Sequence, residues 1–241
     1  MIAVWKREMG QYFKTPVGYL FLGLFTLLCG LMFAFYNIKG GGGASLYVLL
    51  TGMRLPFMLI APLLTMRLMA EEKRSKTDQL LLTSPLSVAD IIVGKALAAY
   101  AMLALALLLT GLLPLLIAPY ARVEFGVAFA AYLGFFLMNL CTLSVGVLMS
   151  ALCTSQVSAA VLTLGVNMLM YLLEGYVLPQ LGYSYLAFLY EALSFLSLSG
   201  RFATFQTGVI HFNQVIYFLS FSALMLLLSG LAVERRGWVK G

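Results

Sequence analysis

Two ionisable residues, Arg54 and Glu174, stand inside long apolar stretches of the sequence. A charge at membrane depth costs several kcal/mol unless it is paired or hydrated, so such residues mark either function or buried structure. If both stretches cross a bilayer as helices, the two depths differ by roughly 7 Å, which a long arginine side chain bridges. The two residues therefore predict a gate or substrate contact, a structural ion pair, or two separate side chains that reach the interface.

The other chemistry-bearing residues form no recognisable catalytic or metal site. The sequence contains no G-x-S-x-G motif, no H-E-x-x-H motif and no His-Asp cluster. His211 is the only histidine and has no second ligand at metal spacing. Three scattered cysteines, Cys29, Cys141 and Cys153, predict buried apolar side chains. The glycine run at residues 40–43 lacks a following G-K-[ST], so we expect no nucleotide site, no bound cofactor and no enzymatic activity in this chain.

The elements that must position these residues are membrane-spanning helices. The sequence is 62% hydrophobic and only 10% charged, against about 25% charged in an ordinary soluble domain. Several apolar stretches reach the ~20 residues that a helix needs to cross a hydrocarbon core. The predicted spans are residues 17–38, 46–67, 91–118, 127–151, 157–178 and 212–233. We therefore predict an all-α integral membrane protein with six transmembrane helices, in which residues 1–241 form one domain and Asn139 and Asn167 join helices.

Positive charges predict the orientation of these helices. An even number of spans puts both termini on one side, and most basic residues fall on that side: Lys6, Arg7, Lys14, Arg67, Lys73, Arg74, Lys76, Lys95, Arg235, Arg236 and Lys240. Only Lys39, Arg122 and Arg201 fall on the other side. Because lysine and arginine collect on the cytoplasmic side, we expect both termini in the cytoplasm and the protein in a bacterial cytoplasmic membrane. Orientation explains the basic excess, so no nucleic-acid partner is predicted.

Two segments outside the spans suit the membrane surface. Residues 1–15 predict a helix lying in the headgroup plane, because one face gathers Ile2, Trp5, Met9, Tyr12 and Phe13 opposite Arg7, Gln11 and Lys14. Residues 179–211 are apolar and aromatic but are broken by Gly182 and Gly200. This second segment predicts one or two short re-entrant helices in the outer leaflet, which a partner subunit would cover.

The cytoplasmic segment after the second predicted span is the most informative. Ser75 with Asp78 is a helix start signal, and Ser84 before Pro85 is a stop signal. These signals predict a helix of about two turns over residues 76–83, held between two membrane helices. Its sequence includes three consecutive leucines, Leu80, Leu81 and Leu82. At least one of them should point toward water or a partner, which predicts protein docking.

Three stretches of the chain resemble the type-2 ABC exporter permeases, and within them the gliding-motility-associated branch of short six-span subunits. The first and most specific is PLLTMR at residues 62–67, followed by EEKR at 71–74 and TDQLLLTSPLS at 77–87, and ending in GK at 94–95. The second is SALCTSQ at residues 150–156. The third runs from F-x-x-F-x-x-G-V-I at 202–210 into VIYFLS at 215–220, with a basic tail at 235–236.

The resemblance implies a permease subunit whose ATPase is a separate polypeptide. Residues 76–83 would be the coupling helix, which enters a groove on the ATPase, and residues 1–15 would be an interfacial connecting helix. The ATPase-docking residues would be Glu71, Glu72, Lys76, Asp78, Gln79, Leu80, Leu81, Leu82, Thr83, Ser84 and Pro85. The Asp78-Gln79 pair departs from the family, in which a glutamate often stands before the leucines.

The expected assembly contains two permease chains, identical or paralogous, and two ABC ATPase subunits that bind ATP and Mg²⁺. Its expected activity is export of an unknown substrate, amphipathic or lipid-like in view of the aromatic outer segment. Two other functions remain open at this point. One is a non-transporting membrane anchor or mechanical transmitter for an ATPase, and the other is an intramembrane lipid-modifying enzyme, for which the sequence offers no catalytic pair.

Overall fold

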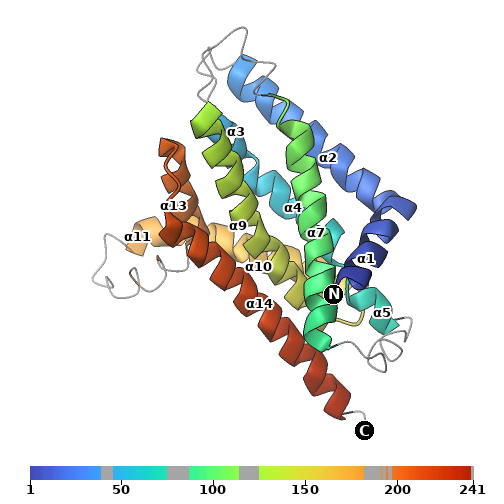
Figure 1. The fold of residues 1–241 in the computed structure, drawn as a ribbon. Coiled ribbons are helices and arrows are strands. Elements are labelled where there is room, and N and C mark those ends of the chain that lie inside the picture. Colours follow the sequence, from blue (N-terminus) through green and yellow to red (C-terminus); the bar gives the residue numbers. More distant parts are fainter. Residues whose placement is uncertain are drawn as a thin grey trace.

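The computed structural model describes residues 1–38, 46–74, 87–113, 125–181, 191, 194 and 197–239. Within these residues every regular element is a helix and none is a strand, which confirms the predicted all-α fold. The chain starts with α1 (Ile2–Lys14) and α2 (Pro16–Phe33), and α2 continues into a π-helical turn, η1 (Ala34–Ile38). Figure 1 shows the helices gathered into one elongated bundle.

Five of the described helices are long and apolar enough to cross a membrane, as expected of a multi-pass membrane protein. They cover Pro16–Tyr36, Val88–Thr110, Phe125–Leu152, Gln156–Gln180 and Phe212–Glu234. The corresponding elements are α2 with η1, α7 (Val88–Thr110), α9 (Phe125–Leu152), α10 (Gln156–Leu172) with the π-helical turn η2 (Leu173–Val177) and α11 (Leu178–Leu181), and α14 (Phe212–Val239). Their ranges agree with five of the six predicted spans.

The remaining predicted span, residues 46–67, is divided into two short helices. These are α3 (Leu46–Gly52) and α4 (Arg54–Thr65), separated by a turn at Met53. At 7 and 12 residues, neither helix alone reaches the ~20 residues that span a bilayer. Pro62 inside α4 removes one backbone hydrogen bond shortly before the chain turns at residues 66–69 into α5 (Ala70–Arg74). The total of six spans therefore stays a prediction.

The central helix of the bundle is α9. Its sequence is apolar on every side, the pattern of a helix enclosed by others, and α4, α7, α10 and α14 pack around it. Phe135 of α9 meets Phe57 of α4 edge-on, with ring centres 6.0 Å apart. Gly146 lies against Thr65 so closely that any side chain there would displace α4. Aromatic packing and a missing side chain thus fix α4 against α9 at two levels.

At one end of the bundle, α1 lies across α7 and beside α5; we call this the α5 end (Figure 1). Val4, Glu8 and Tyr12 of α1 face the protein and are buried. Ile2 and Phe13, which belong to the predicted apolar face, remain exposed. The predicted apolar face is therefore divided, with Tyr12 turned to the protein and only Ile2 and Phe13 open to lipid, and the location of α1 in the headgroup plane stays a prediction.

The opposite end, which we call the α13 end, carries α13 (Leu198–Ala203) and the 3-10 helix η3 (Thr204–Thr207). Phe202 and Phe205 are buried there against α9. Gly208 follows with a φ of 76°, a left-handed conformation that favours glycine, and it turns the chain toward α14. Short helices predicted in residues 179–211 are therefore present in the described part, although residues 182–190 lie outside it and the re-entrant depth stays a prediction.

Candidate functional site

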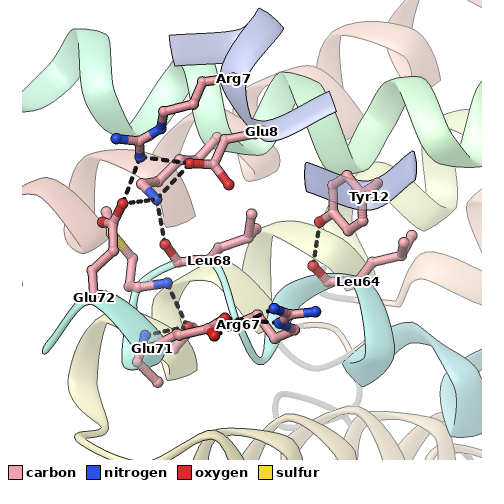
Figure 2. Close-up of polar contacts among 12 residues, drawn as sticks. Arg7, Glu8, Tyr12, Leu64, Arg67, Leu68, Glu71 and Glu72 are labelled. Atoms are coloured by element: carbon pink, nitrogen blue, oxygen red, sulfur yellow. Dashed lines mark hydrogen bonds and ion pairs between the residues drawn. The ribbon is translucent and has the colours of Figure 1, made fainter. Parts of the chain in front are cut away.

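Four charged side chains meet at the α5 end, where α1, α5 and α7 approach one another (Figure 2). The Nζ atom of Lys95 lies 3.1 Å from Glu8 Oε1 and 2.9 Å from Glu72 Oε1. The Nη2 atom of Arg7 lies 2.7 Å from Glu8 Oε1 and 2.6 Å from Glu72 Oε1. We call Arg7, Glu8, Glu72 and Lys95 the charge cluster. Its two cations and two carboxylates balance, so it adds no net charge where three helices meet.

The centre of the charge cluster is buried. The exposed fraction of the side chain is 1% for Lys95 and 6% for Glu8, against 42% for Arg7 at the rim. Lys95 also donates to the Leu68 carbonyl at 2.5 Å, so its ammonium has three acceptors for its three hydrogens. Partial burial lowers the pKa of Arg7, but its contacts with Glu8 and Glu72 outweigh burial and raise that pKa above its ordinary value. Removing one member would leave an uncompensated charge in a buried place.

Tyr12 attaches α1 to the last turn of α4. Its hydroxyl donates to the Leu64 carbonyl at 2.5 Å (Figure 2). The final carbonyls of a helix have no partner inside the helix, and Tyr12 supplies one. Burial, assisted by the negative charge of Glu8, raises the pKa of Tyr12 far above its ordinary value. The phenol therefore stays protonated and remains a hydrogen-bond donor at any physiological pH.

Helix α9 holds the same segment from its other side. The Ser150 hydroxyl oxygen accepts the backbone N–H groups of Met69 and Ala70 at 3.1 and 3.2 Å. Lys73 donates to backbone carbonyls at and just beyond the end of α9. Residues 64–74 are thus bound by α1, α7 and α9, and they lead directly into residues 75–86.

At the α13 end, Arg54 and Glu174 form an ion pair. Arg54 Nη2 lies 2.8 Å from Glu174 Oε2, and both side chains are about nine-tenths buried. Arg54 also donates to the Ser199 hydroxyl and lies over the ring of Tyr171, 5.5 Å from its centre. The Glu174 carboxylate accepts the backbone N–H groups of Leu198 and Ser199. The structure therefore brings together the two charges that stand out in the sequence, whereas a role as a gate stays a prediction.

A family comparison agrees with this architecture, since the model of the ABC-2 type transporter family matches residues 1–198. The chain belongs to the ABC-2 type transporter family. None of the curated proteins compared with it matches. Family membership makes the chain a type-2 ABC permease, and it implies an ABC ATPase partner and a dimeric arrangement in general. The matched residues include the whole charge cluster and the Arg54–Glu174 pair, whereas α14 lies beyond them.

Among the docking residues predicted for this ABC-2 permease, Glu71 and Glu72 lie in the described part of the chain. Glu71 pairs with Arg67 one turn earlier, at 2.8 Å, and Glu72 belongs to the charge cluster. The others, Lys76, Asp78, Gln79, Leu80, Leu81, Leu82, Thr83, Ser84 and Pro85, lie outside the described residues, as does the predicted helix over 76–83. Their contact with an ATPase stays a prediction. The structure adds that Glu72 faces α1 and α7.

Sequence reasoning did not single out Glu8 or Lys95 as a site. In the sequence, Lys95 counts as one of the positive charges of the cytoplasmic side and ends the GK pair of the family resemblance. It lies within the apolar helix α7, and an isolated charge in such a helix was the signal that a buried partner exists. Glu8 stands four residues from both Val4 and Tyr12, the spacing of one helical face, and that face is the buried one.

The remaining residues singled out in the sequence are Asn139, Asn167, the three cysteines and His211. Asn139 donates to the Phe135 carbonyl of its own helix at 2.7 Å, so the contact seen for it lies within α9 and not between helices. Asn167 is buried on α10. The three cysteines are free and buried, in agreement with the sequence reading. His211 is exposed, and no group of three metal-ligating residues occurs among the residues described.

Proposed function

We propose that this ABC-2 permease couples ATP hydrolysis by separate ATPase subunits to export of a substrate, and that residues 76–83 are its coupling helix. The main support is the anchoring of residues 64–74, which lead into that segment. The charge cluster, Tyr12 and Ser150 bind these residues to α1, α7 and α9. A loosely attached coupling helix would move without moving the rest of the permease. A coupling helix whose preceding residues are bound to three helices transmits the motion of the ATPase to those helices.

The proposed complex contains two permease chains, identical or paralogous, and two ATPases that carry ATP and Mg²⁺. Coupling requires that the closed state of the ATPases favours one arrangement of the membrane helices over another. The spans of α2, α10 and α14 are only 22%, 17% and 22% buried within the chain, which leaves apolar faces for lipid and for a second permease. The chain itself is proposed to be non-catalytic.

The proposed orientation puts the α5 end in the cytoplasm and the α13 end outside. In this proposal α3 and α4 together form one span, the second along the chain, which brings the total to six. The basic residues near α1 and α5 support this assignment, because positive charge collects on the cytoplasmic side of bacterial membranes. A lipid-like or amphipathic substrate fits the exposed apolar side chains at the α13 end, such as Tyr176 and Val209. These assignments place the ATPase and the exit route at opposite ends.

The docking proposal is tested by Leu81→Asp. The permease is purified from its native membrane, and we expect a P-loop ATPase to purify with it in equal amount and to hydrolyse Mg-ATP. Leu81→Asp should abolish this association, because a charge among the leucines of the proposed coupling helix would prevent their burial in an ATPase groove. Retention of the ATPase by a correctly folded Leu81→Asp protein would remove this docking site.

A matched control introduces the same charge elsewhere. Val209 is an exposed apolar residue at the α13 end, and Val209→Asp should leave ATPase association unchanged. Vesicles with the reconstituted complex then separate export from anchoring. Stimulation of ATP hydrolysis by amphipathic compounds, with their appearance across the membrane, is expected of an exporter, whereas a mechanical transmitter would show neither.

A further inference from the structure

Glu174 joins three distant parts of the chain at the α13 end. Its Oε1 accepts the N–H of Leu198 at 2.5 Å, and its Oε2 accepts the N–H of Ser199 at 3.1 Å. The same Oε2 lies 2.8 Å from Arg54 Nη2, and Arg54 donates to the Ser199 hydroxyl. A single carboxylate thus connects the first turn of α13 with α4 and with the end of α10.

The two ends of α13 are held by different kinds of contact. A helix of six residues is not stable by itself, so its position depends on what holds it. Glu174 binds its first turn through charge and hydrogen bonds. Phe202 and Phe205 hold its last turn and η3 through apolar packing on α9. Loss of the Glu174 contacts would therefore release the first turn while the phenylalanines stay packed.

Both charges of the pair stand where the chain departs from a continuous α-helix. Glu174 lies in the π-helical turn η2, and such turns are frequent at functional sites. Arg54 directly follows the turn at Met53 that separates α3 from α4. Each side chain can therefore shift with a local change of backbone and without unfolding a complete helix. This placement suits a contact that opens and closes.

The pairing of Arg54 is also incomplete. Its Nε atom is buried and has no hydrogen-bond partner within the described residues. A buried donor without a partner raises the free energy of the arrangement that contains it. The bound arrangement is therefore favoured less strongly than its short ion pair suggests, and a released arrangement lies closer in free energy.

We infer that Glu174 is the catch of a lid formed by residues 198–207, that is, by α13 and η3. In the arrangement seen here the catch is closed, and the first turn of α13 is held over α4 and α10. Tilting of α4 relative to α10 separates Arg54 from Glu174, releases the two amides and lets the first turn of α13 swing out. The inference deepens the proposed function, because such a lid would open the exit, but the contacts that carry it do not depend on any ATPase.

A cysteine at position 198 reports on the lid. Leu198 is 5% exposed, so Leu198→Cys is protected while the lid is closed. The three native cysteines are replaced by alanine, and a membrane-impermeant maleimide is added to sealed right-side-out membrane vesicles and to permeabilised ones. We expect Glu174→Ala to speed labelling at least about tenfold, because it removes several hydrogen bonds to a charged group. An unchanged rate would overturn the inference.

Two controls distinguish lid release from general unfolding. Glu191→Ala removes an exposed acid from the same outer segment and should leave the labelling rate unchanged. Ala159→Cys places a reporter at a fully buried position at the α5 end, which should stay protected. If Glu174→Ala also exposes the cysteine at position 159, the milder Glu174→Gln is used in its place. Faster labelling at position 198 alone then supports the lid, and an unchanged labelling rate at position 198 contradicts it.

The charge-swapped protein with Arg54→Glu and Glu174→Arg tests the nature of the catch. It retains opposite charges, but arginine at position 174 cannot accept the N–H groups of Leu198 and Ser199. Fast labelling should therefore persist. Slow labelling of position 198 in the charge-swapped protein would show that a simple ion pair holds the lid, and it would overturn the proposed role of Glu174. Labelling only in permeabilised membranes would contradict the proposed orientation while leaving the lid intact, so the two failures are distinguishable.

Discussion

At the residue scale, Lys95 is the most deeply buried member of the charge cluster, and its ammonium contacts both carboxylates. We predict that Lys95→Met lowers the free energy of unfolding by about 3–5 kcal/mol, the usual effect of removing one partner from a buried ion pair. Thermal unfolding in detergent measures this change. Lys6→Met removes an exposed lysine of α1, next to Arg7 in the chain, and as the control it should leave the midpoint nearly unchanged.

The same cluster permits a compensation test. After Lys95→Met, Arg7 alone faces two carboxylates, and adding Glu8→Gln removes the more deeply buried one, so that one cation again balances one carboxylate. The double variant should regain part of the lost stability, since removing both sides of a buried pair is far less harmful than removing one. A double variant less stable than Lys95→Met alone would contradict the charge-balance argument.

Tyr12 gives a second prediction at this scale. Tyr12→Phe should lower stability by about 1 kcal/mol through the lost bond to the Leu64 carbonyl. Because burial raises the pKa of Tyr12 in the folded chain, its contribution is complete below about pH 10, where the unfolded phenol is neutral, and is lost as the pH rises further. Unfolding of both proteins between pH 7 and pH 11 should show a difference that shrinks at the alkaline end. A similar loss in Tyr19→Phe, at an exposed tyrosine, would argue against this account.

At the element scale, the contact of α4 with α9 depends on the missing side chain of Gly146. A β-carbon there would lie 2.8 Å from both Cβ and the methyl carbon Cγ2 of Thr65, and closer still to its hydroxyl oxygen, so α4 would have to move. We predict that Gly146→Ala lowers stability by about 1–3 kcal/mol, as overpacking does. Gly165→Ala on α10 meets nothing within 4 Å and should be neutral or slightly stabilising. Equal unfolding midpoints for the two variants would contradict the packing argument.

At the scale of the whole molecule, the number and orientation of the spans are open to a direct test. Cysteines at Gly42 and at Arg74 flank α3 and α4, in a chain without native cysteines. If these two helices together cross the membrane as proposed, an impermeant maleimide should label position 42 in intact cells and position 74 only after permeabilisation. Labelling of both positions from one side would show that α3 and α4 do not cross the membrane.

The class of fold and the membrane spans could be predicted from the sequence because they depend on local quantities. Apolar length decides whether a helix can cross a bilayer, and five of the long apolar stretches are such helices. The broken span at residues 46–67 was harder to foresee. Pro56 has no N–H to donate to the Gly52 carbonyl beside the turn at Met53, but a proline by itself does not tell whether a helix bends or is divided.

The sequence by itself determined that lipid is the solvent, that Arg54 and Glu174 need special surroundings, and that the segment after residue 74 resembles a coupling helix. Only the tertiary structure decided which charges meet. Glu8 and Lys95 are 87 residues apart in the sequence. Glu174 accepts backbone N–H groups, which every residue except proline carries and which a sequence therefore does not mark. Composition and spacing describe one helix at a time, whereas a buried charge is satisfied by whichever helix packs against it, and that partner is chosen by the fold.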